Sequence, residues 1–311
     1  MNKNNPFTVV KKDQLRSLGE RKLIDTIKVW LGKTNPNTPY GIGDDCAVIP
    51  NTNSQLITVD PLIYGRHFDD TVSAYHAGEK LIKRNISDIA AMGGKPTCCV
   101  ISLTLDPTVK ITWLKKFYLG LKDTAQSYAI KIVGGDIAEL KGSLAATLTL
   151  LGEKTTNRFL TRHTAKSNDL IFVTGKLGLS LPSKHHYTFT PRIKEAQWLV
   201  KKLYVTSLMD ISDGLAKDIH SLIPKKAAAC IYADKIPLKR GATVKNGLCD
   251  GEDYELLFTV KPTANLKLFE AQWKKRFPDT PLTLIGHMSP ASKKNKTAIN
   301  LSTFQGFEHL A

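Results

Sequence analysis

The sequence lacks the common signatures of nucleotide-binding and acyl-transfer enzymes. Gly94-Lys95 is followed by proline, so the chain has no complete phosphate-binding loop of the form GxxxxGK[ST]. No GxGxxG stretch joins an expected strand to an expected helix, and the chain has neither a protein-kinase HRD sequence nor a GxSxG nucleophile motif. These absences exclude P-loop nucleotide hydrolases, dinucleotide-binding enzymes, ordinary protein kinases and serine hydrolases.

Cysteine is scarce and shows no ligand pattern. The chain has five cysteines, an odd number, with no C-x-x-C pair and with Cys98 adjacent to Cys99 in an apolar run. This excludes a disulfide framework and a zinc site, and it indicates small buried residues in a reducing compartment. No apolar stretch has the length of a signal sequence or a membrane span, so we expect a cytoplasmic protein with no membrane partner.

Acidic residues are outnumbered by basic ones. The chain has 28 Asp and Glu against 44 Lys and Arg, which gives a formal net charge of +16 and an isoelectric point near 9.5. Such a positive charge makes nucleic acid the first partner to consider. The lysines, however, occur as scattered pairs such as Lys115-Lys116 and Lys274-Lys275, with few interleaved aromatic residues. We therefore expect solvated basic faces that attract small anions, and no nucleic-acid partner.

The length of 311 residues is enough for two domains, each with its own core. The polar, basic stretch 152–167 is the expected boundary, which divides the chain into residues 1–153 and 154–311. Both parts alternate helical and strand patterns, which predicts an α/β (α+β) fold. The expected helices are 13–31, 73–92, 113–128, 191–203, 209–223 and 265–277. The expected strands are 46–49, 56–59, 97–105, 130–133, 143–151, 169–175, 255–260 and 282–285.

Several acids stand beside glycine, serine or the end of an expected strand. Asp44 and Asp45 follow a glycine-hinged loop, where two adjacent anions favour a bound cation. Acids in comparable positions are Asp60, Asp88, Asp136, Asp210, Asp213 and those of 250–253. Separated carboxylates without a His and Cys cluster favour Mg²⁺ over zinc, and Mg²⁺ usually links carboxylates to substrate phosphates. The pattern therefore predicts a phosphate-bearing substrate, with Gly134-Gly135 and Gly251 allowing close approach of the backbone.

Eight blocks occur in an order that resembles the thiamine-monophosphate kinase family. They are GIGDDCA (41–47), GRHF (65–68), NISDIAAMG (85–93), VGGD (133–136), LTR (160–162), VTG (173–175), MDISDGL (209–215) and GEDYELLF (251–258). The resemblance extends from about Asp44 to about His309. It implies a two-domain PurM-like fold, with N-terminal domains that form a β-barrel across a homodimer and a C-terminal α/β sandwich domain. The implied reaction is the ATP-dependent phosphorylation of thiamine monophosphate to thiamine diphosphate.

The resemblance also implies roles for individual residues. The implied Mg²⁺ ligands are Asp44, Asp45, Thr58, Val59, Asp60, Asp88, Asp136, Asp210 and Asp213. ATP would contact Tyr128, Gly135, Asp136, Arg162 and Ser212, and thiamine monophosphate would contact His67, Glu252 and Phe307. No side chain is implied as an acid or base, because a phosphate ester with a second pKa near 6 is already an ionised nucleophile at neutral pH. Metals and Arg162 would stabilise the charge of the transition state.

The chain departs from the family pattern at several places. Thr58-Val59-Asp60 stands where Ser-Thr-Asp is common, so one hydroxyl is lost and only a backbone carbonyl remains as a ligand at Val59. The segment 178–192 is short and carries His185-His186 where a helix of small residues is usual, which predicts a truncated helix. Asp250 replaces a glycine and adds a negative charge, which suits a thiazolium cation.

A single acid of this set is weak evidence for a metal site. Any one of the acids taken alone is more often a helix cap or a turn residue than a metal ligand.

Two other functions remain open from the sequence. One is another ATP-using enzyme of the same superfamily, of the aminoimidazole ribonucleotide synthetase or selenophosphate synthetase type. The other is an inactive basic protein that binds nucleic acid, which steeply salt-dependent binding would reveal.

Overall fold

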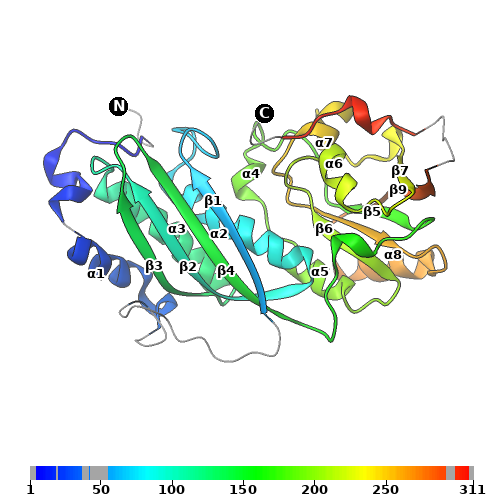
Figure 1. Cartoon of the computed structure of the whole chain (residues 1–311), viewed down its shortest axis with the longest axis horizontal. Helices are drawn as coiled ribbons and strands as arrows, with labels where there is room; N and C mark the ends of the chain where they lie inside the picture. Colours follow the sequence, from blue (N-terminus) through cyan, green and yellow to red (C-terminus); the bar gives the residue numbers. More distant parts are fainter. Residues whose placement is uncertain (1–4, 19, 37–41, 43–54, 292–297, 308–311) are drawn as a thin grey trace. The chain divides into compact units, whose positions relative to one another are not determined.

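The computed structural model describes residues 5–18, 20–36, 42, 55–291 and 298–307. Contacts between residues divide the chain into two units: Met1–Ile89 with Lys95–Glu153, and Ala90–Gly94 with Lys154–Ala311. Each unit contains one sheet with helices packed against it, so the fold is mixed α/β (Figure 1). In the part of the chain that the structure describes, no helix is long and apolar enough to cross a membrane.

The first unit contains a sheet of strands β1 (Gln55–Ile63), β2 (Gly94–Leu105), β3 (Lys131–Glu139) and β4 (Leu144–Lys154). Their order in the sheet is β1-β4-β2-β3, with β1 antiparallel to β4 and β2 parallel to β3. Parallel neighbours need a crossover connection, which helix α3 (Ile111–Ser127) supplies between β2 and β3. The other helices are α1 (Glu20–Leu31) and α2 (Ala74–Ala91), with short 3-10 turns at Lys11–Asp13, Leu15–Ser17 and Gly32–Thr34.

Strand β1 presents different side chains to the two faces of its sheet. Leu56 and Leu62 are buried, whereas Ile57, Val59 and Ile63 are 72%, 58% and 39% exposed. Side chains alternate with a period of two along a strand, so Thr58 and Asp60 share the face of the two leucines. The opposite face of β1 carries a row of apolar side chains that this chain leaves exposed.

Helix α2 begins and ends where its sequence predicts. The hydroxyl of Ser73 accepts a hydrogen bond from the backbone N–H of His76 at 3.2 Å, which caps the first turn. Gly93 follows the last turn with φ +72°, a left-handed conformation that glycine adopts without a steric penalty. The helix therefore places Asp88, in its C-terminal half, at a fixed position relative to the sheet.

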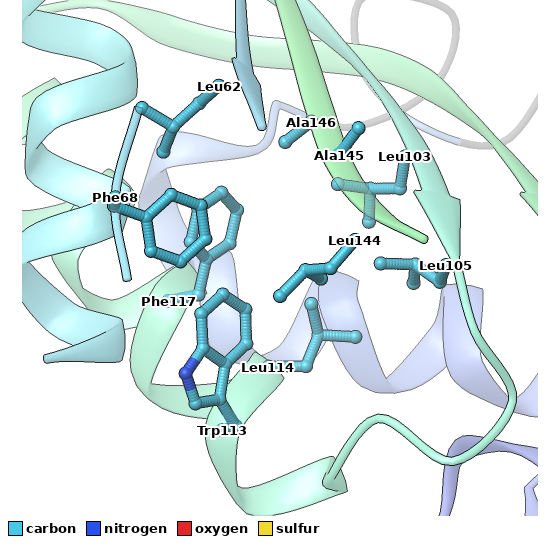
Figure 2. A pocket seen from close by; sticks show the side chains of 10 residues that line it. All are labelled: Leu62, Phe68, Leu103, Leu105, Trp113, Leu114, Phe117, Leu144, Ala145 and Ala146. Carbon is cyan, nitrogen blue, oxygen red and sulfur yellow. The ribbon is translucent and has the colours of Figure 1, made fainter. Parts of the chain in front are cut away.

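Aromatic and leucine side chains line a small cavity between α3 and the sheet. The rings of Phe68, Trp113 and Phe117 stack at centroid distances of 5.9 and 5.5 Å. Figure 2 shows these rings facing Leu103 and Leu144, which come from β2 and β4. The cavity offers about 10 Å³, about the room of one water molecule. This size and the apolar lining exclude it as a site for a phosphate-bearing ligand.

Strand β3 continues through Gly134-Gly135-Asp136 to Glu139, so the prediction of a strand that ends at Val133 was wrong. Glycine is required within this strand because a neighbouring backbone lies close to it. A Cβ atom on Gly135 would lie 2.0 Å from the carbonyl oxygen of Ile101 in β2, whereas one on Gly134 would lie 3.5 Å from Val100 Cγ1. The absent side chain of Gly135 thus permits the pairing of β2 with β3.

Replacing Gly135 with Ala is therefore expected to lower the free energy of unfolding by about 2–3 kcal/mol, the usual cost of overpacking. The matched variant Gly134→Ala places its methyl group at an ordinary contact distance, so we expect a change below about 1 kcal/mol. Urea unfolding of both variants measures the difference. Equal stability of the two variants would contradict the assignment of the close approach to Gly135.

The second unit contains a sheet in the order β6-β8-β5-β9-β7, in which all neighbouring strands are antiparallel. The strands are β5 (Leu170–Thr174), β6 (Val205–Asp210), β7 (Ala227–Ile231), β8 (Leu256–Val260) and β9 (Leu282–Pro290). The helices are α4 (His185–Thr188), α5 (Ile193–Leu199), α6 (Leu215–Asp218), α7 (Val244–Cys249) and α8 (Leu266–Arg276). Short 3-10 turns occur at Arg162–Thr164, Ile219–Ser221, Ala233–Lys235 and Leu301–Thr303.

The central strand β5 has apolar side chains on both faces. Phe172 stacks on Phe258 at 5.6 Å and meets Phe269 of α8 edge-on at 5.7 Å. Its neighbours Ile171 and Val173 pack into a separate buried cluster that includes residues of β6 and α6. Because β5 is buried on both faces, its sequence is a continuous apolar run.

Several elements differ from the sequence-based expectation. Helix α1 begins at Glu20 and not at Asp13, because 3-10 turns occupy the preceding residues. The helix expected over 209–223 is confined to Leu215–Asp218 and a 3-10 turn, since the residues before it form β6 and its end. Strands β6 and β7 and helix α7 were not predicted, and α4 has only four residues, as the shortened segment suggested. The expected strand 46–49 lies outside the described residues.

Candidate active site

In the first unit, the C-terminal half of α2 brings one acid against β1. The hydroxyl of Thr58 donates a hydrogen bond to Asp88 Oδ2 at 2.5 Å. One turn earlier, Arg84 Nη1 donates to the carbonyl oxygen of Pro61 at 2.7 Å, and Arg84 Nη2 lies 3.5 Å from Asp60 Oδ1. Residues four apart share one face of a helix, which is why Arg84 and Asp88 both face β1. The structure therefore gathers Thr58, Asp60 and Asp88 into one oxygen-rich cluster.

Two residues of the implied metal set lie apart from this cluster. The side chain of Val59 is on the opposite, exposed face of β1. Asp136 is exposed on β3, at the other end of the described sheet from β1. Strands are spaced about 4.8 Å apart, so the order β1-β4-β2-β3 separates these strands by roughly 14 Å. Asp44 and Asp45 lie outside the described residues.

The donor set fits magnesium in its chemistry. Thr58, Asp60 and Asp88 offer oxygen atoms alone, which a hard divalent cation prefers. Within the described ranges, no three His, Cys, Asp or Glu side chains are close enough to hold a metal ion by themselves. Magnesium commonly uses one or two carboxylates and completes its shell with water and substrate phosphates, so a small protein contribution suits this ion.

His67 and Tyr128 both make local contacts in the first unit. The Nδ1 atom of His67 accepts a hydrogen bond from the backbone N–H of Ile63 at 3.0 Å, which leaves a neutral ring with its proton on Nε2. Lys80 Nζ donates to the carbonyl oxygen of His67 at 2.7 Å. Tyr128 caps the C-terminus of α3 and is half-buried. Local contacts thus fix the position of the GRHF turn.

In the second unit, the loop after β6 carries three of the implied site residues. Asp210 is buried at the end of β6, and Ser212 and Asp213 follow it. The backbone N–H groups of Ser212 and Asp213 both donate to Asp218 Oδ2, at 2.9 and 3.0 Å. Burial, and next the nearby charge of Asp210, raise the pKa of Asp218 to about 7. Asp218 therefore holds this loop in place, a role that we did not predict.

Asp213 is connected directly to the C-terminal segment. Lys217 Nζ lies 2.9 Å from Asp213 Oδ2 and donates to the carbonyl oxygen of Phe307 at 2.6 Å. The backbone N–H of Phe307 donates to the carbonyl oxygen of Asp213 at 2.8 Å. An implied metal ligand and an implied substrate contact thus meet, and Lys217 joins them. The sequence signal for Lys217 and Asp218 was their spacing after Asp213 in DGLAKD.

The GEDYE loop, residues 250–255 between α7 and β8, runs beside the same β6 loop. The backbone N–H of Glu252 donates to the carbonyl oxygen of Ser212 at 2.7 Å, and that of Tyr254 donates to the carbonyl oxygen of Ile211 at 2.8 Å. A Cβ atom on Gly251 would lie 2.7 Å from the carbonyl oxygen of Ser212, so this glycine also permits a close approach of two backbones. Ser212, Asp213, Glu252 and Phe307 therefore occupy one site in this unit.

Arg162 lies on a 3-10 turn that packs against β6. The backbone N–H of Leu208 donates to the carbonyl oxygen of Thr161 at 3.3 Å, and Thr164 Oγ1 donates to the carbonyl oxygen of Thr206. Arg162 itself is exposed. The turn places Arg162 beside β6, the strand that ends in Asp210.

Asp253, inside the GEDYE loop, forms a buried ion pair. Its side chain is fully buried and lies 2.7 Å from Lys239 Nζ. Burial raises the pKa of Asp253 to about 6, although the charge of Lys239 opposes this shift. Because the folded-state pKa exceeds the ordinary value, the stability from protonating Asp253 is fully present below pH about 4 and is lost as the pH rises through about 6.

Replacing Lys239 with Met is expected to lower the free energy of unfolding by about 2–4 kcal/mol at pH 8, where the variant leaves a buried carboxylate unpaired. At pH 4.5 the expected loss is below about 1 kcal/mol, because Asp253 is then protonated in the folded state. Urea unfolding at the two pH values measures the difference. Lys235→Met, which removes an exposed partner of Asp234, is the control and should change little at either pH. An equal loss at both pH values for Lys239→Met would contradict the ion-pair assignment.

Comparison with known proteins identifies the broad class to which the chain is similar. The family model for the AIR synthase related protein, N-terminal domain, matches residues 43–153, which places the first unit in that class. The fold agrees with solved structures of hydrogenase maturation protein HypE: HypE in complex with ATP has a TM-score of 0.71 at 17% identity and covers 89% of each chain. At that identity the likeness concerns the fold alone.

Closer relatives identify the family. Thiamine-monophosphate kinase of Haemophilus influenzae is 32% identical over 94% of this chain and 98% of its own length. The corresponding enzyme of Buchnera aphidicola subsp. Schizaphis graminum is 34% identical over 84% of this chain and 88% of its own length. The structure of AaThiL complexed with AMPPCP and TMP is 29% identical, has a TM-score of 0.67, and covers 96% of this chain and 99% of that one. The chain therefore belongs to the thiamine-monophosphate kinase family, and the PurM-like fold that its motifs implied is confirmed.

Proposed function

We propose that this protein transfers the γ-phosphate of ATP directly to thiamine monophosphate, forming thiamine diphosphate and ADP. The observation that carries the proposal is the likeness over nearly the whole chain to a structure that holds both AMPPCP, a non-hydrolysable ATP analogue, and TMP. A cytoplasmic location, where ATP and Mg²⁺ are abundant, is part of the proposal.

The carboxylates serve to hold metal in this proposal. In the first unit, Thr58, Asp60 and Asp88 supply the gathered oxygen atoms, and Val59 would offer only its backbone carbonyl. The remaining proposed ligands are Asp44, Asp45, Asp136, Asp210 and Asp213. Bound Mg²⁺ would neutralise the repulsion between two phosphorylated molecules, which is the main obstacle to phosphoryl transfer.

The other side chains position the two substrates. Tyr128, Gly135, Arg162 and Ser212 are the proposed contacts of ATP, and the exposed guanidinium of Arg162 suits an anionic phosphate. His67, Glu252 and Phe307 are the proposed contacts of thiamine monophosphate. The Glu252 carboxylate suits the positive thiazolium ring, and Asp250 adds charge of the same sign in the same loop. No side chain has to remove a proton, because the acceptor phosphate is already ionised at neutral pH.

We also propose a homodimer in which the sheets of two first units form a shared β-barrel. The support is the exposed apolar row of Ile57, Val59 and Ile63 on one face of β1, since water contact with such a row is unfavourable. Burying it against a second copy would remove these side chains from water. The proposal assigns ATP and Mg²⁺ binding and dimerisation to residues 1–153, and completion of the nucleotide and substrate site to residues 154–311.

Coupled release of ADP tests the function. The purified chain with ATP and Mg²⁺ should release ADP when thiamine monophosphate is added, and not when an aminoimidazole ribonucleotide precursor or selenide is added. Turnover with one of the latter two would instead identify another enzyme of the superfamily. Absence of turnover with any thiamine phosphate would reject the proposal.

A further inference from the structure

A short segment of the second unit, Gly178–Phe189, contacts the GEDYE loop along its length. We name this segment the clamp segment. Its backbone N–H groups donate to two acids of the loop: Gly178 to both carboxylate oxygens of Asp253, at 3.1 and 3.2 Å, and Leu179 to Asp250 Oδ2 at 2.7 Å. The hydroxyl of Ser180 donates to the carbonyl oxygen of Gly251. The loop is thus fixed from outside by a neighbouring segment.

The two histidines of the clamp segment contact successive residues of the loop. His185 Nε2 lies 2.9 Å from the carbonyl oxygen of Asp253. Burial, with the positive charge of Lys239, lowers the pKa of His185, so the neutral ring donates its Nε2 proton to that carbonyl. His186 is buried, and its Nδ1 atom lies 3.5 Å from Glu252 Oε2. One histidine therefore contacts the loop backbone and the other contacts the Glu252 carboxylate.

The backbone of the loop needs such support. Glu252 and Tyr254 have φ values of +63° and +50°, in the left-handed region that side chains other than glycine rarely adopt. Conformations of this kind persist where surrounding contacts over-determine them. The ring of Phe189, at the end of the clamp segment, stacks on Tyr254 at 4.0 Å, and the Tyr254 hydroxyl lies 3.5 Å from Glu252 Oε1. Contacts with the clamp segment and within the loop thus reach both carboxylate oxygens of Glu252.

We propose that His186 is a positioning residue that orients the Glu252 carboxylate toward the thiazolium ring of thiamine monophosphate; the inference rests on the proposed function. A carboxylate recognises a cation best when it is already oriented, since less conformational freedom is lost on binding. His185 contacts the backbone of the same loop, Phe189 stacks on the ring of Tyr254, and His186 contacts the side chain that meets the substrate. The His185-His186 pair, which stands where the family pattern has a helix of small residues, thus makes direct contacts with the loop.

Two substitutions of His186 separate positioning from packing. His186→Phe keeps a planar ring of similar size and removes Nδ1, whereas His186→Asn places an amide nitrogen near the position of Nδ1. We expect His186→Phe to raise KM for thiamine monophosphate about tenfold and to change kcat and KM for ATP by less than about twofold. We expect His186→Asn to restore KM for thiamine monophosphate to within about threefold of the unsubstituted protein.

A matched control removes a His–Glu contact elsewhere. His76 Nδ1 lies 2.6 Å from Glu79 Oε2 on α2, and His76→Phe should leave both KM values unchanged. Titration calorimetry of thiamine monophosphate binding in the absence of ATP gives a second readout, in which His186→Phe should weaken binding by a similar factor. An unchanged KM for thiamine monophosphate in His186→Phe, or an equal rise in KM for ATP, overturns the inference. If the unsubstituted protein neither binds nor phosphorylates thiamine monophosphate, the proposed function itself fails.

Discussion

Replacing Asp213 or Asp88 with Asn is expected to lower kcat/KM for phosphorylation of thiamine monophosphate by roughly 1,000-fold, equivalent to about 4 kcal/mol of transition-state stabilisation. Each substitution keeps the size of the side chain and removes one negative charge from a proposed Mg²⁺ ligand. Steady-state kinetics over a range of Mg²⁺ concentrations measure the loss. A thermal shift induced by Mg²⁺ with a non-hydrolysable ATP analogue should shrink in both variants.

The same substitutions should leave the metal-free fold almost unchanged. Asp213 and Lys217 form a partly exposed pair, and such pairs contribute about 1 kcal/mol or less. An Asn at position 88 still accepts the hydrogen bond from Thr58 through its amide oxygen. Asp25→Asn, which removes the partner of Lys28 on α1, is the control that should retain full activity. A large loss of metal-free stability in Asp88→Asn or Asp213→Asn would make these acids structural instead.

Replacing Arg192 with Met is expected to lower the free energy of unfolding by about 3–5 kcal/mol. Arg192 forms a two-pronged ion pair with Glu255, with Nε 2.8 Å from Oε2 and Nη2 2.6 Å from Oε1. Glu255 is 2% exposed, and its Oε2 atom also accepts a hydrogen bond from the hydroxyl of Thr174 at 2.7 Å. The variant therefore leaves a buried carboxylate without its cation.

The double variant Arg192→Met with Glu255→Gln should recover more than half of that loss, because no buried charge then lacks a partner. Lys95→Met, which removes an exposed partner of Glu153, should change stability by less than about 1 kcal/mol. Urea unfolding gives all three values. A loss below about 1 kcal/mol in Arg192→Met would show that the pair does not support the base of the GEDYE loop.

Much of the first unit was predictable because local pattern and tertiary environment agree there. Ser73 and Gly93 mark the two ends of α2 by capping chemistry that needs no distant partner. Strand β3 was misjudged because the need for Gly135 comes from Ile101, which is distant in sequence. Strand β7 was missed because Ala227–Ile231 is rich in alanine, a weak strand former, and only its pairing with β9 defines it.

The candidate site was predictable where motifs supply its residues and unpredictable where packing does. Ser212, Asp213 and Glu252 belong to the motif blocks, and Phe307 is implied by the wider resemblance. The structure brings all four together, although their roles stay predictions. His186 contacts Glu252, which is distant in sequence, so no local pattern reveals its role. Asp218 contacts the backbone of Ser212 and Asp213 only a few residues away, and its spacing in DGLAKD was the one signal for it. The sequence also grouped Asp136 with Asp60 and Asp88, whereas the strand order places it at the far end of the described sheet.

Phosphorus-31 NMR of one reaction mixture tests the central claim of direct phosphoryl transfer most directly. With the purified protein, ATP, Mg²⁺ and thiamine monophosphate, we expect the two phosphorus signals of thiamine diphosphate to grow in step with those of ADP, without release of inorganic phosphate. Accumulation of inorganic phosphate without thiamine diphosphate, or unchanged ATP and thiamine monophosphate, would contradict the account.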